Sequence, residues 1–367
     1  MVELDVFRLV ASLTNPPEAP YPVILPDFFL DHFVKVDSFK DLLDGLELLA
    51  EQGGGNLLGT EQLVRRGGNS VNTASALKRL GLDPVVIVTT DEYGASLMRA
   101  LVDEDLDLSH VHEDGRLSAT VSIEAEHEGR RINLMISDSG SASRFEFSDF
   151  TEEDLTAIRG CGLVALLNLN HNEAGSQLAS ELFEFVKSES RAQTFMDIGD
   201  PSSHPEYVKP IVDHVLREGL VDFLGVNENE VIWLTRALGD TRWSEKASNP
   251  DAWLDAALHV SSELEVRIDL HTPYYSSTIL DDDVVSAPAF EAHGAITLGA
   301  GDAWNAGSIW GYLHRLEPED RIVLANAVAA LYVSSPDVNH PTRTEIVRFL
   351  ESVPPLSGHG KKLLKLG

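Results

Sequence analysis

The chain has 367 residues, 43% of them hydrophobic, which is enough for one large α/β unit with a sizeable core. Its 59 acidic residues far exceed its 28 basic ones, and a net charge of −31 argues against nonspecific binding to nucleic acid or to anionic membranes. The single cysteine, Cys161, excludes an internal disulfide and argues against a cysteine-built metal site.

Other features of the composition bear on where the protein works. No run of about 18 apolar residues is present, so no membrane-spanning helix is expected. The N-terminal segment lacks the basic start of a signal peptide, which favours a cytoplasmic protein. An excess of carboxylates keeps a protein hydrated in strong salt, so we expect adaptation to a halophilic, archaeal-type cytoplasm.

In chain order, the first predicted element is a strand over residues 28–39, where apolar and polar residues alternate. Residues 84–90 form a continuous apolar run after a helical pattern. Alternation returns in residues 118–125 and 130–137, and EHEG between them is a plausible hairpin turn. The segments 28–39 and 118–137 are therefore expected to form a small antiparallel β lid.

Further along the chain, apolar strands alternate with helical patterns. This order predicts a mostly parallel sheet covered by helices on both faces, within a single domain that spans residues 1–367. The expected strands are 162–170, 192–199, 221–227 and 266–272.

The stretch HGAITLGAGDAWNAGS (293–308) contains Gly299, Ala300 and Gly301 immediately before Asp302. An aspartate at a helix start is either a helix cap or a catalytic base. A cap alone does not account for three consecutive residues with almost no side chain. Their amide groups, at a helix N-terminus, would form an anion hole.

Several phosphate and nucleophile motifs are excluded at this stretch. A dinucleotide fingerprint would need Gly or Ala where Trp304 stands, and the chain has no Walker A loop or nucleophile elbow. An anion hole beside a carboxylate suits phosphoryl transfer, in which the amides hold the moving group and the carboxylate takes the hydroxyl proton.

These motifs carry a family resemblance. TLGAGDAWNAGSIWGYL resembles the second signature of the ribokinase-like (PfkB) carbohydrate kinases, and residues 65–94 are similar to their first signature. VNENE (226–230) resembles the family's Asn-x-x-Glu motif, and the segment that contains Asp31 resembles its opening strand. The resemblance spans roughly residues 22–333 and implies a three-layer α/β/α fold with a β lid.

The resemblance also implies a role for each matching residue. Asp302 would be the general base, and Gly299, Ala300 and Gly301 would form the anion hole. Asp31, Gly67, Gly68 and Asn72 would hold a sugar-like acceptor. Asn227 and Glu230 would act through water on the Mg²⁺ that accompanies the nucleotide.

Other residues are expected on the nucleotide side. Asp197 ends a strand, where it would either face the phosphates or form an Asx turn. His271 and Thr272 end the predicted strand 266–272, which would border the nucleotide, and Asn326 and Ala329 face inward from a helix that resembles the one flanking the adenine. ATP is the expected donor, with ADP as the alternative. Ile296 replaces an acidic residue that helps some family members to bind a monovalent cation.

Structural alternatives remain open at this stage. Gly67 and Gly68 would also suit a plain turn, Asn227 and Glu230 a helix start, and Asp31 a charged edge strand. His110 and His112 are expected to lie in a solvated loop rather than to bind metal. A nucleoside kinase and a catalytically silent sugar-binding regulator are the alternative functions. An exposed lid edge also suggests a homodimer formed through the lid.

Overall fold

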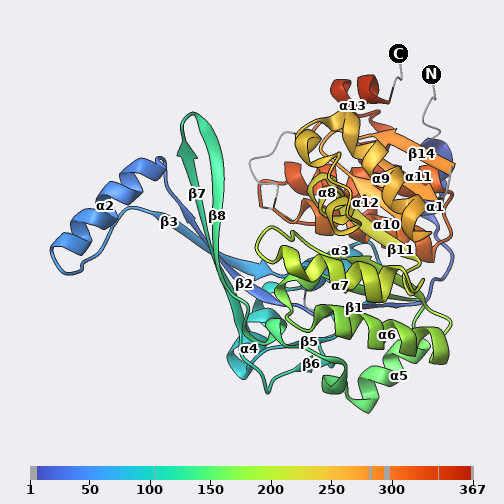
Figure 1. Ribbon diagram of the computed structural model, residues 1–367, viewed down its shortest axis with the longest axis horizontal. Coiled ribbons are helices and arrows are strands. Elements are labelled where there is room, and N and C mark those ends of the chain that lie inside the picture. The colour runs from blue at the N-terminus through green and yellow to red at the C-terminus, as the bar shows by residue number, and fades with distance from the viewer. Residues whose placement is uncertain (1–5, 104, 281–282, 293–297, 338, 365–367) are drawn as a thin grey trace.

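The computed structural model describes residues 6–103, 105–280, 283–292, 298–337 and 339–364. At its centre is an eight-stranded sheet with the order β14-β13-β12-β11-β10-β9-β1-β4 (Figure 1). The six strands from β4 to β12 are parallel, and β13 and β14 are antiparallel. The predicted mostly parallel sheet is therefore confirmed. The strands are β1 (Pro22–Leu25), β4 (Val85–Val86), β9 (Leu163–Leu167), β10 (Gln193–Asp197), β11 (Phe223–Asn227), β12 (Arg267–His271), β13 (Tyr275–Leu280) and β14 (Asp283–Pro288).

Helices cover both faces of this sheet, which explains why β1, β4 and β9 are apolar throughout. Along β9, Val164 and Leu166 belong to one hydrophobic cluster, whereas Leu163 and Leu167 belong to the other. The first cluster includes residues of α5 (Glu152–Gly160), α6 (Gly175–Glu189), α7 (Val208–Ile211), α8 (Glu228–Ala237) and α9 (Pro250–Leu264). The second includes residues of α1 (Val6–Thr14), α3 (Asn69–Arg79), α4 (Glu92–Leu101), α10 (Ala300–Leu313), α11 (Pro318–Ser334) and α12 (Arg343–Glu351). None of the helices in the described ranges combines the length and the apolar character that a membrane span requires.

The residues before the first strand form α1, which packs against α12 and α11. Leu9 and Leu13 are buried in the second cluster, and Arg8 forms an ion pair with Asp320 of α11 (Nε to Oδ2, 2.5 Å). The helix α1 thus covers the part of the second hydrophobic cluster that lies against α11 and α12.

A second, four-stranded sheet with the order β3-β2-β7-β8 projects from the body as the lid (Figure 1). Its strands are β2 (Phe29–Lys35), β3 (Glu61–Gly67), β7 (Ser118–His127) and β8 (Arg130–Asp138). The lid is not purely antiparallel as predicted, because β2 and β7 pair in parallel. The predicted strand 28–39 was too long: β2 ends at Lys35, and Ser38 caps the helix α2 (Phe39–Glu51). Neither α2 nor β3 was predicted.

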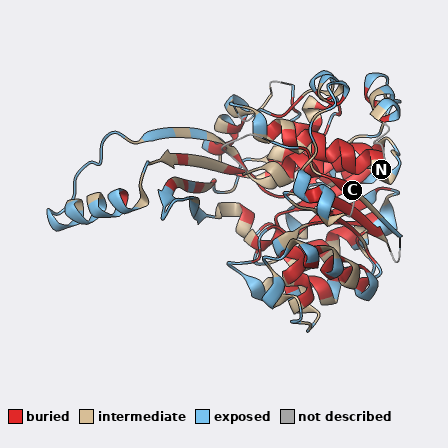
Figure 2. Cartoon of the chain, turned by 90° about the horizontal axis from the view of Figure 1, so that it is seen from above, coloured by how far each residue is buried: buried red, intermediate tan, exposed pale blue. Residues whose placement is uncertain are grey.

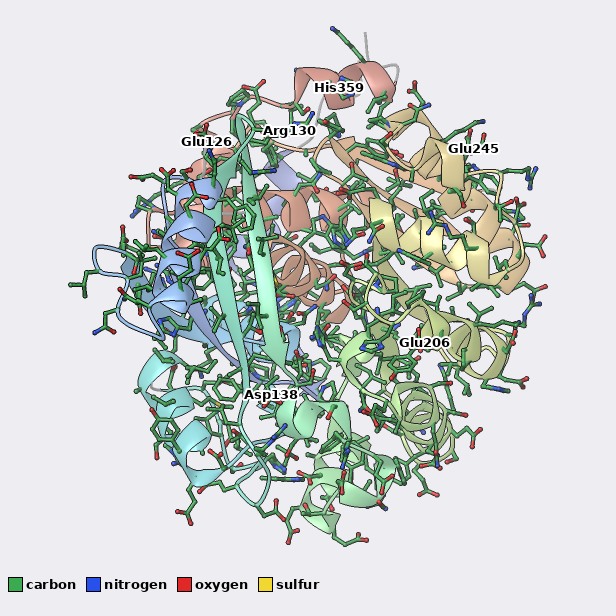
Figure 3. The ribbon with its side chains drawn as sticks, turned by 60° about the vertical axis from the view of Figure 1, so that its left-hand side comes forward. Glu126, Arg130, Asp138, Glu206, Glu245 and His359 are labelled. Atoms are coloured by element: carbon green, nitrogen blue, oxygen red, sulfur yellow. The ribbon has the colours of Figure 1, made fainter. Side chains whose placement is uncertain are left out.

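The predicted hairpin turn between β7 and β8 is confirmed. Glu128 and Gly129 both have positive φ angles, 51° and 74°, as a two-residue turn of the primed type requires. Glu126 and Arg130 lie near the tip of this hairpin, and Asp138 lies at its base (Figure 3). The strand β8 and the helix α2 are mostly exposed and the other lid strands are largely only partly buried, in contrast to the buried central sheet (Figure 2).

The predicted strand 84–90 is divided between two sheets. Val85–Val86 form β4 at the edge of the central sheet, whereas β5 (Val88–Thr89) pairs with β6 (Val111–His112) in a separate two-stranded sheet. An apolar run identifies a buried strand but not the point at which the chain leaves one sheet for another.

A buried ion pair joins the sheet to α11. The guanidinium of Arg321 donates to both carboxylate oxygens of Asp269 on β12, at 2.6 and 3.0 Å, and Tyr312 donates to the same carboxylate at 2.8 Å. Burial alone would raise the pKa of Asp269, but the charge of Arg321 and these hydrogen bonds hold it below its ordinary value. Asp269 is therefore a structural carboxylate, ionised and fully paired.

Arg321→Met should lower the free energy of unfolding by about 3–5 kcal/mol, because it leaves Asp269 buried without its cation. Asp269→Asn in the same chain should restore part of that loss. The wild-type contribution is present above the ordinary carboxyl pKa and disappears as the pH falls through the depressed folded-state pKa, so the difference between wild type and the double variant should shrink in acid. Urea denaturation at several pH values measures these effects.

The control is the half-exposed surface pair Lys187–Asp222 (2.7 Å), where Lys187→Met should cost under about 1 kcal/mol. If Lys187→Met and Arg321→Met lowered the free energy of unfolding by the same amount, the structural role assigned to Arg321 would be contradicted.

Candidate active site

The predicted site residues gather at the edge of the sheet where the parallel strands end. In open α/β sheets, ligands bind in the crevice outside the carboxyl ends of the strands. The lid connects directly to this edge, because β2 follows β1 after only three residues. At the same edge, β10 ends at Asp197, β11 at Asn227 and β12 at His271.

The glycine turn adopts a conformation that requires glycine. Gly299 is the N-cap of α10 with φ 81°, and a Cβ atom there would lie 2.6 Å from the hydroxyl oxygen of Tyr332. Within the described residues, no side chain caps the first turn of α10. The first amides of a helix have no intrahelical acceptor, so this turn presents N–H donors and the positive end of the helix dipole.

Asp302 is not the cap of this helix but its third residue. Its side chain is buried, and its Oδ2 accepts a hydrogen bond from Nδ2 of Asn72 on α3 at 3.0 Å. Burial raises the pKa of Asp302 well above its ordinary value, and the nearby charges of Asp197, Asp27 and Asp31 raise it further, against the opposing hydrogen bond from Asn72. A carboxyl with a raised pKa is a better proton acceptor once it is ionised.

Two of the predicted acceptor residues line one cavity with the glycine turn. Asp31 on β2 and Asn72 on α3 face this space together with Gly299. The remaining lining residues are Phe33, Lys35, Leu63, Arg65, Arg66, Leu298 and Tyr332. Burial, followed by the charge of Asp27, raises the pKa of Asp31 to about 7.

The structure gives the two predicted acceptor glycines a steric role beside this cavity. A Cβ atom on Gly67 would overlap the carboxylate of Asp31, and one on Gly68 would lie 2.9 Å from the backbone oxygen of Asp27. Gly68 also has φ 86° as the N-cap of α3. The glycine pair therefore lets β3 turn tightly into α3 against β2.

Asn227 and Glu230 form a capping box at the start of α8. Glu230 accepts from the backbone N and from Nδ2 of Asn227, both at 2.8 Å, and its own backbone N donates to Asn227 Oδ1 at 2.9 Å. The helix-start alternative is thus realised, but Glu230 is also buried. Burial, and then the charge of Asp197, raise the pKa of Glu230 well above its ordinary value.

Asp197, the last residue of β10, forms hydrogen bonds with α10 and with the turn that follows its own strand. Its Oδ2 accepts from Asn305 on α10 at 2.7 Å, and its Oδ1 accepts from the backbone N of Gly199 at 2.9 Å, which is an Asx-type contact. Its negative charge raises the pKa of both Glu230 and Asp302.

This arrangement fits a cation that is held through water. Among the described residues, no three His, Cys, Asp or Glu side chains are grouped to ligate a metal ion directly. The buried carboxyls nevertheless oppose one another, so a hydrated cation between them would be favoured electrostatically.

His271 and Thr272, which were expected on the nucleotide side, make different contacts. The His271 ring stacks on Trp304 with centroids 4.9 Å apart, and its buried Nδ1 has no partner in the described part of the chain. Burial lowers the pKa of His271 to about 4, so the ring is neutral. The Thr272 hydroxyl instead donates to the backbone oxygen of Tyr275 at 2.7 Å and closes the β12–β13 turn.

Asn326 and Ala329 lie on α11, whose predicted segment began too late in the chain. The Asn326 side chain is committed to the core, where its Oδ1 accepts from Ser276 (2.6 Å) and from Trp304 (2.9 Å). It therefore positions Trp304, the residue on which His271 stacks. Ala329 is only partly buried.

Sequence reasoning missed Asp27, which organises the start of the lid. Its Oδ1 accepts from the backbone N and the hydroxyl of Ser70, and its Oδ2 accepts from the backbone N of Asn69 and from Nδ2 of Asn168. Its place directly after a buried strand was the available signal. Tyr332, Arg65 and Arg66, which line the cavity, were also missed.

The expectation of a solvated loop at His110 and His112 was wrong. His110 Nδ1 and His112 Nε2 contact the two oxygens of the buried Asp154 at 2.6 and 2.8 Å. These contacts tie the loop to the start of α5. Ile296, where a cation-binding acid was missing, lies outside the described residues.

The model of the pfkB family carbohydrate kinases matches residues 33–345. A comparison with curated proteins found no significant match.

Solved structures show the same fold at low sequence identity. Arabidopsis thaliana ribokinase, complexed with ribose and ATP, is 19% identical with a TM-score of 0.70, over 91% of this chain and 99% of that one. Methanocaldococcus jannaschii nucleoside kinase is 16% identical (TM-score 0.62; 91% and 98% covered), and Burkholderia thailandensis nucleoside kinase in complex with inosine is 17% identical (TM-score 0.64; 90% and 98% covered). The expected three-layer ribokinase-like fold is confirmed, and with a family match over most of its length the chain belongs to the pfkB family of carbohydrate kinases.

Proposed function

We propose that this kinase moves the γ-phosphate of ATP to a hydroxyl group of a sugar or sugar-like acceptor, with Asp302 as the general base. The observation that carries this proposal is the position of Asp302. Its carboxyl is buried in the first turn of an uncapped helix, directly after the turn of Gly299, Ala300 and Gly301. A proton acceptor and a set of anion-binding amides therefore stand side by side.

The chemistry follows from this pairing. Asp302 takes the proton of the acceptor hydroxyl while the amides of the turn bind the transferred phosphoryl group. The nearby acceptor residues Asp31 and Asn72 hold the substrate, and Asn72 also orients the Asp302 carboxylate through its hydrogen bond. Lid closure over the acceptor would exclude water, which otherwise competes for the phosphoryl group.

The nucleotide would lie on the other side of α10. We assign Asn227 and Glu230 to the hydrated Mg²⁺, with Asp197 beside them, and His271 and Ala329 to the nucleotide wall. When bound, Mg²⁺ neutralises charge on the nucleotide phosphates. Thr272 and Asn326 shape this wall through their turn and core contacts. ADP remains the alternative donor.

Two other functions fit the same fold. A nucleoside kinase would use the same base and anion hole, and nucleoside kinases occur among the structural neighbours. A silent sugar-binding regulator would keep the cavity without turnover, but the buried, raised-pKa Asp302 favours catalysis.

We also propose that two copies pair through the lid in the cytoplasm of a halophilic cell. On the lid face opposite Asp31, one row of neighbouring strands contains Val64, His32, Val121 and Ile136, and its three apolar members are 42%, 37% and 65% exposed. A second copy would cover this row.

Asp302→Asn should keep the fold and lower kcat by roughly a thousandfold or more, because the general base and its charge are lost. The assay measures ATP and ADP consumption with Mg²⁺ against sugars, sugar acids, sugar phosphates and nucleosides. Asp251→Asn, at an exposed first-turn position of α9, is the control and should leave turnover unchanged. Near wild-type turnover in Asp302→Asn would refute the mechanism.

Asp302→Asn should also stabilise the ligand-free protein, increasingly so as the pH rises. A buried carboxyl with a raised folded-state pKa is protonated more readily in the folded than in the unfolded state, so it lowers stability above the unfolded pKa of about 4. Melting temperatures of wild type and variant from about pH 4 to 9 measure the gap. In the same range, wild-type kcat/KM should fall in acid with a limb well above pH 4. A melting-temperature gap that does not change with pH would argue against a raised pKa.

The net charge of −31 predicts that the melting temperature rises when KCl increases from about 0.1 M to about 2 M, because salt screens repulsion among surface carboxylates. Sucrose at matched osmolarity is the control, since it is excluded from protein surfaces without screening charge. Full stability in dilute buffer would exclude the halophilic adaptation.

A further inference from the structure

The wall of the acceptor cavity carries a concentration of positive charge. Lys35, Arg65 and Arg66 all line this small space beside Gly299. The whole chain has only 28 lysines and arginines against 59 acidic residues, so three cations around one cavity stand against the general charge of the protein. All three come from the lid strands β2 and β3.

The two arginines are not paired with carboxylates in the described part of the chain. Arg65 donates from Nη1 to the backbone oxygen of Asp337 at 2.6 Å, and Arg66 donates from Nη1 to that of Leu101 at 3.5 Å. The Nε of Arg66 is buried with no partner among the described residues. Lys35 differs, because it lies 3.4 Å from Glu61. The guanidinium groups therefore retain positive charge and N–H donors that can bind an anionic ligand.

These cations do not serve to neutralise Asp31. Arg65 pairs in register with Asp31 across β2 and β3, which places both side chains on the same lid face. Within the described residues, however, the two side chains form no ion pair. The pKa of Asp31 is accordingly raised to about 7 by burial and by Asp27 rather than lowered by the guanidinium. The positive charge of Arg65 is left for a ligand.

We infer that the acceptor is itself an anion, a sugar that carries a phosphate or a carboxylate group, and that Arg65 and Arg66 bind this group. The inference rests on the proposed kinase function. The alternative, that the arginines hold the transferred phosphoryl group, fits less well. The cavity reaches Gly299 of the anion-binding turn at one end, but the acceptor residues Asp31 and Asn72 and several lid residues form the rest of it. The proposed nucleotide-side residues Asn227, Glu230 and His271 are not among its described lining residues.

The chemistry of the groups supports this assignment. A guanidinium binds phosphate or carboxylate through two parallel hydrogen bonds, which fixes orientation as well as affinity. The far end of the acceptor would then present a hydroxyl to Asp302. The hydroxyl oxygen bonds to the γ-phosphorus, its proton goes to Asp302, and the bond from that phosphorus to the leaving nucleotide breaks. The product is a sugar bisphosphate or a phosphorylated sugar acid.

The test measures turnover of related acceptors of which one is neutral and the other carries an anionic group: ribose against ribose 1- and 5-phosphate, fructose against fructose 1- and 6-phosphate, and glucose against the open-chain acid gluconate. We expect kcat/KM for an anionic member to exceed that of its neutral partner by about a hundredfold. Arg65→Gln should raise KM for the anion at least about tenfold with a smaller effect on kcat. Arg130→Gln, at the hairpin tip of the same lid (Figure 3), removes the same charge away from the cavity and should change neither value.

Calorimetric binding of the same compounds to wild type and to Asp302→Asn separates this inference from the proposed function. Binding of an anion without turnover by wild type would defeat the kinase proposal but support anion recognition. Equal or better turnover of neutral sugars or nucleosides would overturn the inference and leave the kinase standing. Absence of both binding and turnover across the panel would overturn both. Should Arg65→Gln fail to fold, the wild-type comparison of the matched pairs still decides. A comparison of the sugar phosphates with gluconate shows whether the site prefers a phosphate or a carboxylate group.

Discussion

The candidate active site depends on carboxyl groups that lie close together and, in the described part of the chain, form no ion pair with a lysine, arginine or histidine. The charges of Asp197, Asp27 and Asp31 raise the pKa of Asp302, and the charge of Asp197 raises that of Glu230. Such crowding costs folding free energy, because each charged form is desolvated and repelled. The surrounding hydrogen bonds, from Asn72, Asn305 and the Asp27 network, offset part of that cost. The remaining imbalance favours the binding of positively charged groups and a readily protonated base.

The same fold shows how a buried carboxylate looks when its role is structural. Asp269 receives two hydrogen bonds from Arg321 and one from Tyr312, and its pKa is lowered. Asp302 receives a single side-chain hydrogen bond, and its pKa is raised. Both side chains are buried, Asp302 on α10 itself and Asp269 in contact with it, so burial alone does not separate them. The paired cation of Asp269 does, because it explains a structural role for Asp269 and supports our proposal that Asp302 is the general base.

Local sequence patterns were sufficient for the body of the fold and for the centre of the site. Apolar runs that end in polar residues located β9 to β12, and the glycine turn located the start of α10 to within two residues, because these signals are carried by neighbouring positions in the chain. The partner of each strand is not carried in this way. Alternation predicted β2 and β7 but not their parallel pairing. The exposed strand β3 has only two apolar residues, Leu63 and Val64, whereas α2 was missed although its apolar residues recur at helical spacing. Asp27 was missed because its hydrogen-bond donors Ser70 and Asn168 are distant from it in sequence.

The charged groups of the body and those of the lid are positioned in different ways, the first by strand ends and the second by strand pairing. The body supplies carboxyls at strand ends, where the parallel sheet places them at one edge whatever the details of the loops. The lid supplies the cations through the register of β2 and β3, which sets Arg65 beside Asp31. A shift of that register by one residue would turn Arg65 to the outer face and bring Val64 inward. Gly67 lies two residues beyond Arg65 on the same lid face, and the missing side chain there leaves room for the carboxylate of Asp31. The glycine that marks the family in sequence therefore lets Asp31 and Arg65 share the lid face on which we propose that the acceptor binds.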